Sequence, residues 1–326
     1  MKKFLIKAVL FLLLVFGIII IYILLASNKK FDAPLPSIQA SSDSTIIARG
    51  EYLVYGPAHC AGCHVSKEQI EAVERGERVP LSGGWEISIP PGTFRAPNLT
   101  PDPETGIGNV SDEELARAMR HMVAPDGRMM MSFMPFQEMS SNDLRAVISY
   151  LRTQEPVKNK IDAQSLSFLG KALMAFGVLK PEGPKKEIPE HVEPDSSATY
   201  GKYLAYNVAN CYGCHTERDL KTGKFIGKPF GGGFHMTGES FSEGYSFVTP
   251  NITTDPETGR LANWSEKAFI ARFRAGRVIE HSPMPWGSFS RLSDTDLKAL
   301  YRYLVSVEPV YNKIEKSIFE PGEALP

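Results

Sequence analysis

The sequence predicts an all-α protein that contains two tandem domains. Helical periodicity recurs along the chain, no segment alternates for long in the manner of a β-strand, and one unit of sequence occurs twice. The chain has 326 residues, a length typical of two domains. Its formal net charge is −1 and it has no basic stripe, so nucleic acid is not an expected partner.

Turn and cap signals separate the expected helices. Ser111 and Glu114 have the spacing of a capping box before an apolar-periodic stretch. The Gly-rich segments around Trp85 and Phe234 are expected to be loops. Two of the expected helices stop before a Glu-Pro pair, where proline prevents a helix from continuing. These two helices span residues 143–153 and 294–307, and two short amphipathic helices are expected at residues 43–55 and 199–207.

The repeated unit determines the expected domain organisation. The segment Asp102–Gly106 recurs identically as Asp255–Gly259, and other matched positions keep an offset between 149 and 153 residues. Between the two copies lies a segment whose second half is rich in proline and charge, which is typical of a linker. The expected parts are an anchor at 1–27, a tether at 28–43, domains at 44–161 and 196–315, a linker at 162–195 and a C-terminal tail at 316–326.

The N-terminus carries a long apolar run, Ala8–Ala26, of 19 residues. At 1.5 Å per residue it can cross a hydrocarbon core of about 30 Å. The apolar core of a signal peptide is usually about 7–15 residues long and ends in small residues, whereas this run is longer and lacks a good cleavage site. An uncleaved transmembrane anchor is therefore preferred, with a cleaved signal as the alternative.

All four cysteines of the chain lie in two C-x-x-C-H motifs, Cys60–His64 and Cys211–His215. Cys60, Cys63, Cys211 and Cys214 can form thioethers to haem, while His64 and His215 bind the iron. Cysteine pairs also bind zinc, but zinc does not require the histidine after each pair. The motifs therefore predict two covalently bound haem c groups. Because covalent attachment requires export, the globular part is expected on the periplasmic or extracytoplasmic side of the cytoplasmic membrane.

Met134 and Met284 are the expected sixth ligands of the two irons. They lie 70 and 69 residues after their histidines, and each is followed by proline and an aromatic residue. The alternatives are Met129–Met131 in the first repeat and two histidines, His121 and His281. His/Met ligation raises the haem potential and fills both axial positions, which favours one-electron transfer over catalysis.

Two further repeated features lie near these sites. Pro97 and Pro250 are candidates to offer a backbone carbonyl to the histidine ring, although a plain loop proline is an equal alternative. The segment Asp102–Gly106 and its copy contain oxygen ligands of the kind that calcium prefers. A proline-containing turn is the preferred interpretation of both copies.

The segment Ala96–Gly108, both C-x-x-C-H sites and both Met-Pro-aromatic motifs resemble the multihaem cytochrome c subunits of membrane-bound alcohol, aldehyde and gluconate dehydrogenases. The resemblance implies class I cytochrome c folds, axial pairs His64/Met134 and His215/Met284, and electrons moving from a dehydrogenase toward the quinone pool or an oxidase. Those subunits carry three haem sites, whereas this chain has two and an N-terminal anchor.

The function expected from these features is that of a membrane-anchored dihaem electron carrier rather than an enzyme. Its expected partners are redox proteins: a dehydrogenase, a quinol-linked complex or an oxidase. The alternatives are a dihaem enzyme of the peroxidase type, which needs one open or His-ligated iron, and a tethered haem sensor. A sensor is expected to carry an effector segment, and none is recognisable in the sequence.

Overall fold

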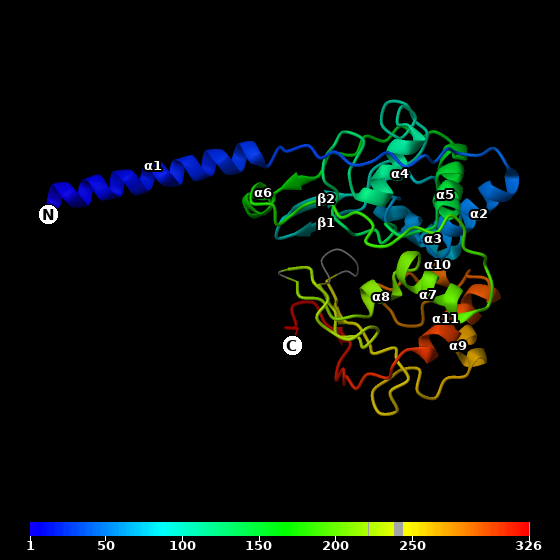
Figure 1. Cartoon of the computed structure of the whole chain (residues 1–326). Coiled ribbons are helices and arrows are strands. Elements are labelled where there is room, and N and C mark those ends of the chain that lie inside the picture. The colour runs from blue at the N-terminus through cyan, green and yellow to red at the C-terminus, as the bar shows by residue number, and fades with distance from the viewer. Residues whose placement is uncertain (221, 238–243, 326) are drawn as a thin grey trace.

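The computed structural model describes residues 1–220, 222–237 and 244–325. Positions 221 and 238–243, inside the second expected domain, and residue 326 of the expected tail lie outside the described residues. The two sequence repeats form the two halves of one body, and helix α1 (Lys2–Ala26) extends away from the first half (Figure 1).

The halves contain matching helices. The first half contains α2 (Ser44–Tyr55), a 3-10 turn η1 (Cys60–Gly62), η2 (Lys67–Gln69), α3 (Ile70–Arg75), α4 (Asp112–His121), α5 (Ser141–Thr153) and α6 (Phe168–Ala175). The second half contains α7 (Ala198–Asn207), α8 (Cys211–Cys214), α9 (Glu266–Arg274), α10 (Trp286–Phe289) and α11 (Asp294–Ser306).

The expected helices are confirmed, with small shifts at their ends. The capping box before α4 is present, with Ser111 and Glu114 bonded reciprocally. Side chains of Asp43, Ser140, Ser197 and Ser293 accept hydrogen bonds from the first turns of α2, α5, α7 and α11. These caps satisfy amide groups that a helix start leaves without partners.

The expectation of an all-α fold is wrong. Each half contains a three-stranded antiparallel sheet, and the two sheets have the order β1-β2-β3 and β4-β5-β6. The strands were missed because each has only two to four residues, too few to show alternation. Their bounds are β1 (Glu86–Ile89), β2 (Gly92–Arg95), β3 (Ser165–Leu166), β4 (His235–Met236), β5 (Ser246–Val248) and β6 (Ile318–Phe319).

The expected linker and tail each contribute a strand. β3 lies in the segment expected as a linker and pairs with β2, while β6 lies in the expected tail and pairs with β5. The first residues of β3 and β6, Ser165 and Ile318, are 153 positions apart, the same offset as other matched positions. The repeated structural unit therefore extends beyond the repeated sequence.

Each half is built around a close crossing of two helices. α2 crosses α5 and α7 crosses α11. A Cβ at Gly50 would lie 1.9 Å from the Ala146 carbonyl oxygen, and a Cβ at Gly201 would lie 1.9 Å from that of Ala299. Glycine is therefore required at both crossings. Buried side chains around them, such as Leu53 and Leu204, belong to one hydrophobic cluster that includes both halves.

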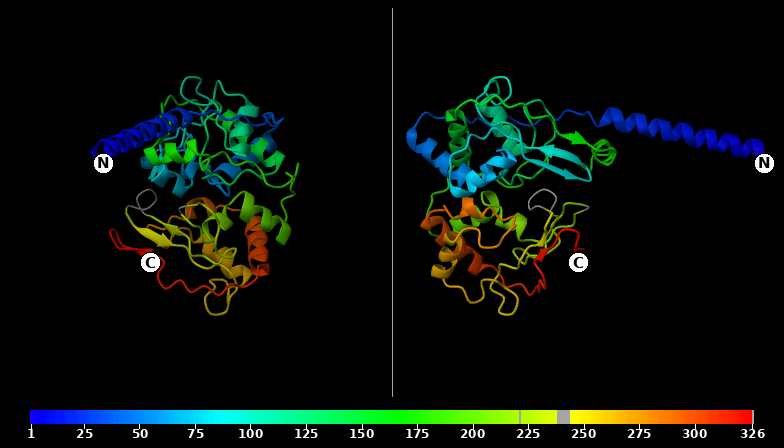
Figure 2. Two further views of the ribbon diagram at one scale, coloured as in Figure 1. Left: turned by 60° about the vertical axis from the view of Figure 1, so that its left-hand side comes forward. Right: turned by 180° about the vertical axis from the view of Figure 1, so that it is seen from behind.

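The two halves hold each other through reciprocal contacts. The Tyr203 hydroxyl donates to Asp143 Oδ2 (2.7 Å) and accepts from the Ser140 amide (3.1 Å). At the matched positions, the Tyr52 hydroxyl donates to Asp296 Oδ2 and accepts from the Ser293 amide (2.8 Å). This exchange is typical of a two-fold interface, here formed inside one chain. The halves lie side by side in both views of Figure 2.

Candidate functional site

Both C-x-x-C-H motifs are tight turns that follow the first helix of their half. The residue before each motif, His59 or Asn210, has left-handed backbone angles, with φ of 39° and 55°. This kink separates the entering helix from the turn. The His64 amide donates to the Cys60 carbonyl at 3.0 Å, and the His215 amide donates to that of Cys211 at 2.8 Å. Each motif's two thiols and imidazole therefore share one helical turn.

The histidine rings are oriented by the predicted proline carbonyls. His64 Nδ1 lies 2.9 Å from the Pro97 oxygen, and His215 Nδ1 lies 3.0 Å from the Pro250 oxygen. A carbonyl oxygen only accepts, so Nδ1 carries the proton and Nε2 keeps a lone pair for a metal. Of the two equal alternatives for these prolines, the structure shows the one in which the carbonyl bonds the histidine ring. Burial lowers the pKa of both histidines and thus favours the neutral, ligating form, although the proline carbonyl opposes this in part.

Two asparagines that the sequence analysis missed hold the proline segments. Asn98 Nδ2 donates to the Val157 carbonyl at 2.8 Å, and Asn251 Nδ2 donates to that of Val310 at 2.7 Å. Both asparagines are at most 2% exposed. Each follows its proline directly, so its bonds fix the neighbouring carbonyl. Their identical place in both repeats was the signal that could have found them.

The repeated Asp-Pro-Glu-Thr-Gly segments are turns, as the sequence analysis preferred. Asp102 Oδ1 accepts from the amide and hydroxyl of Thr105, both at 2.7 Å. Asp255 Oδ1 makes the same bonds to Thr258 at 2.8 and 2.7 Å. These bonds lower the pKa of both aspartates. Within the described residues, no cluster of three or more His, Cys, Asp or Glu side chains could hold a metal ion.

The four cysteines are unpaired and partly exposed. Loss of hydration raises the pKa of Cys60 and Cys211 to about 12, helped by the second thiol of each motif. Loss of hydration likewise raises the pKa of Cys63 and Cys214 to about 11. The chain alone therefore presents both thiols of each motif in the protonated form.

Met134 and Met284 lie in loops and are partly buried against the shared hydrophobic cluster. The Met134 carbonyl accepts from Gln137 Nε2 at 3.2 Å, and the Met284 carbonyl accepts from the Trp286 amide at 2.7 Å. Among the alternatives, Met129 is 2% exposed and pairs with Val123 in a β-bridge. The assignment of Met134 and Met284 as sixth ligands stays a prediction.

The two histidines named as alternative ligands have other surroundings. The His281 ring stacks on Tyr245 with centroids 4.1 Å apart. His121 ends α4 and lines an open pocket of about 310 Å³ together with tether and linker residues. His281 therefore packs against Tyr245, and His121 faces a pocket lined by the tether and the linker.

A half-buried arginine next to the second motif supports the fit of a haem group. The Arg218 guanidinium lies over the Phe225 ring (4.4 Å to the centroid) and donates to the Gly213 carbonyl at 3.5 Å. Its Nε is buried without a hydrogen-bond partner in the described part of the chain. A spare buried donor of this kind fits an acidic group such as a haem propionate. Paired thiols, a free imidazole Nε2 and this donor therefore suit haem c.

Residues 47–155 match the family model described as cytochrome c. This part of the chain is a cytochrome c domain. Haem binding and electron transfer follow from that membership, and haem c in such a domain is held covalently. The matched segment includes Cys60, Cys63, His64 and Met134, the predicted haem residues of the first repeat.

The chain is also similar to named cytochromes. It is 30% identical over 287 residues to the cytochrome c subunit of a quinone alcohol dehydrogenase from Gluconobacter oxydans, covering 82% of this chain and 56% of the relative. It is 29% identical to the gluconate 2-dehydrogenase cytochrome c subunit of Pantoea cypripedii, covering 82% and 60%. It is 25% identical to a dihaem c-type cytochrome of Cereibacter sphaeroides, covering 81% and 86%. The resemblance expected from the sequence is confirmed, but the chain spans little more than half of the dehydrogenase subunits.

Proposed function

We propose that this protein is a membrane-anchored dihaem cytochrome c that carries electrons singly from a dehydrogenase to a downstream acceptor. The observation that carries the proposal is the shared geometry of the two motifs. In both, a residue with left-handed backbone angles precedes the motif. The backbone hydrogen bond across the motif and the histidine–proline bond each have lengths that agree within 0.2 Å between the two repeats. This likeness supports a second cytochrome c domain in residues 196–315, although the family model matches only the first repeat.

The chain's own residues would hold and shield the cofactors. Cys60, Cys63, Cys211 and Cys214 would bind haem through their sulfurs, and His64 and His215 would offer Nε2 to the iron. Met134 and Met284 would take the second axial position and keep small ligands away. When bound, haem c supplies one-electron redox chemistry. Side chains with little exposure around the motifs, such as Leu53 and Leu204, exclude water.

Counting haem groups tests the proposal. The paired replacements Cys60→Ala with Cys63→Ala, and Cys211→Ala with Cys214→Ala, should each reduce covalent haem from two per chain to one. Intact-mass measurement and haem-specific absorbance provide the count. A chain that keeps the same count after the second pair is replaced contradicts the second haem. Peroxide turnover by the unchanged protein would support the enzyme of the peroxidase type instead.

Helix α1 is the proposed anchor. It has 25 residues and is long and apolar enough to cross a membrane, a test that a signal sequence also passes. The Tyr22 hydroxyl donates to the Ala175 carbonyl at 3.1 Å, so the end of α1 packs against α6. α6 lies on the side of the body from which α1 leaves (Figure 1), and its residues Phe168 and Leu169 are exposed. Apolar surface at that side is suited to the membrane interface.

The anchor is tested by fractionation and by mass. The full chain should stay with membranes after an alkaline carbonate wash, and a variant lacking residues 1–27 that is exported through a separate cleavable signal should be released. The intact mass of the membrane-bound protein should include the α1 residues. A mature protein that begins after Ala26 contradicts the anchor and supports a cleaved signal.

The dehydrogenase partner rests on the names of the relatives. Tagged full-length protein, isolated in mild detergent, should copurify with a dehydrogenase large subunit. Its haem should become reduced when the substrate of that dehydrogenase is added. Copurification without substrate-dependent haem reduction contradicts this partner.

A further inference from the structure

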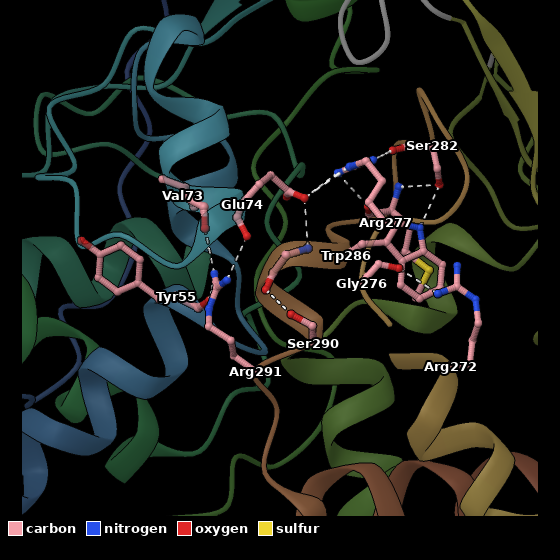
Figure 3. A network of polar contacts seen from close by, with 12 residues as sticks. Tyr55, Val73, Glu74, Arg272, Gly276, Arg277, Ser282, Trp286, Ser290 and Arg291 are labelled. Atoms are coloured by element: carbon pink, nitrogen blue, oxygen red, sulfur yellow. Dashed lines mark hydrogen bonds and ion pairs between the residues drawn. The ribbon is translucent and has the colours of Figure 1, made fainter. Parts of the chain in front are cut away.

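The first half of the molecule contacts the methionine loop of the second half. Helix α3 lies beside α10, which begins directly after Met284 and Pro285 (Figure 3). We propose that Glu74 of the first half is a positioning residue for the Met284 loop, so that the sixth ligand of the second haem depends on the first half. The inference rests on the proposed function, in which Met284 is that ligand.

One carboxylate oxygen holds both sides of the loop. Glu74 Oε2 accepts from Arg277 Nη2 at 3.0 Å, before Met284, and from the Gly287 amide at 3.1 Å, after it. Arg277 also donates to the carbonyl oxygens of Ser282 and Met284, the latter at 3.4 Å. Glu74 therefore connects the backbone on either side of Met284 through one charged group. Charge-assisted bonds of this kind are stronger than neutral ones.

The contact is close and partly shielded from water. A Cβ at Gly287 would lie 2.6 Å from the Glu74 Cα, so glycine allows α10 to approach α3. The side chains of Glu74 and Arg277 are 25% and 34% exposed. Arg291 adds bonds from its Nη2 to the Val73 carbonyl at 3.0 Å and from its Nη1 to the Glu74 carbonyl at 3.3 Å. These carbonyls end α3, where a helix favours cations.

The far side of the loop is fixed within the second half. Trp286 is 7% exposed, and its Nε1 donates to Ser282 Oγ at 3.2 Å. The Arg272 guanidinium lies 3.6 Å from the centre of the indole ring. The loop is thus held on one side by its own half and on the other by Glu74, as the dashed bonds of Figure 3 show.

Among the described residues of the chain, the arrangement has no matched copy, so the dependence runs in one direction. The position 151 residues after Glu74 is Phe225, which forms a β-bridge with Arg218 and is 39% exposed. The Met134 loop is held from within its own half, because Gln137 Nε2 donates to the Met134 carbonyl at 3.2 Å. Arg120 in turn donates to the Gln137 carbonyl at 3.2 Å.

The experiment measures how easily methionine leaves the ferric iron in the full, haem-loaded chain. Glu74→Gln keeps the size of the side chain and removes its charge. It should raise the rate at which imidazole displaces methionine at one haem by roughly tenfold, the scale of one charge-assisted hydrogen bond. The near-infrared absorption band of Met-ligated ferric haem reports the displacement. The other haem should keep its rate, and only one of the two midpoint potentials should shift.

Two control variants distinguish a specific role of Glu74 from a general loosening of the contact between the two halves. Glu71→Gln changes a neighbour on α3 whose side chain is 90% exposed and pairs with Arg75 at 3.9 Å. Tyr52→Phe weakens the contact between the halves away from the loop. Both should leave the displacement rates unchanged. If Glu74→Gln has no effect, or if Tyr52→Phe has the same effect, the positioning role of Glu74 is overturned.

A third variant separates this inference from the ligand assignment on which it rests. Met284→Ala should remove about half of the methionine band and alter the same haem as Glu74→Gln. A full band in Met284→Ala contradicts the proposed ligand itself. A halved band in Met284→Ala together with unchanged rates in Glu74→Gln contradicts only the role of Glu74.

Discussion

Replacing Tyr203 with phenylalanine removes one hydroxyl from the interface between the two halves. That hydroxyl donates to Asp143 Oδ2 at 2.7 Å and accepts from the Ser140 amide at 3.1 Å. Tyr203 and Asp143 are both 6% exposed, and Ser140 is 1% exposed. Water therefore has little access to replace the lost bonds. We expect Tyr203→Phe to lower the free energy of unfolding.

The expected size of this loss follows from the two bonds. A hydrogen bond to a charged group contributes about 1.5–3 kcal/mol, and a buried group left without its partner costs about 1–3 kcal/mol. The ring and its packing stay, so no cavity is added. A net loss of about 2 kcal/mol lowers the midpoint of thermal unfolding by about 4–8 °C for a protein of 150–250 residues, and the effect shrinks with size.

Denaturant unfolding of the full chain in detergent, followed by far-ultraviolet circular dichroism, measures the change. The matched control is Tyr311→Phe, because Tyr311 is 65% exposed. Tyr52→Phe, at the reciprocal position, should cost a similar amount, and the double variant should lose the sum of both. A change under about 0.5 kcal/mol in Tyr203→Phe, the range of ordinary surface substitutions, would refute this account of the interface.

Three other outcomes are expected. Gly50→Ala and Gly201→Ala should each destabilise the protein by about 3 kcal/mol or more, because the new Cβ would lie 1.9 Å from a carbonyl oxygen. Denaturant unfolding measures the loss, and a neutral effect contradicts the close packing of the two helices at each crossing. Burial raises the pKa of Tyr200 and Tyr203, so the unfolded chain ionises first. Stability should be intact below about pH 10 and fall above it, less steeply in Tyr203→Phe, when unfolding is measured against pH. Arg218→Gln should lower the midpoint potential of one haem in a redox titration and leave the other unchanged, since it removes a half-buried positive charge beside the second motif.

The local parts of the candidate sites were predictable because they depend on residues close together in the sequence. Cys60, Cys63 and His64 share one turn, so their spacing alone indicates the chemistry. The repeated context made the Pro97 carbonyl one of two equal alternatives, and the structure shows its bond to His64. The capping box of α4 was predictable for the same reason.

The sheets were not predictable from local pattern. β3 is only two residues long and pairs with β2, more than 70 positions earlier in the chain. Such a strand is stabilised by its partner and not by its own sequence, and its segment contains a linker-like stretch of proline and charge. Pairing across that distance is a property of the folded chain.

The sequence by itself determined that each repeat has two thiols and an imidazole within one C-x-x-C-H motif, because their spacing along the chain places them on one turn. Only the tertiary structure decided how the two repeats meet. Tyr203 reaches Asp143 across 60 positions, and Glu74 reaches Gly287 across 213. Contacts at such separations depend on how the halves dock, and neither carboxylate is marked by a local motif. The two C-x-x-C-H motifs can thus be recognised in the sequence alone. The contact through which the first half supports the Met284 loop is formed only when the chain folds.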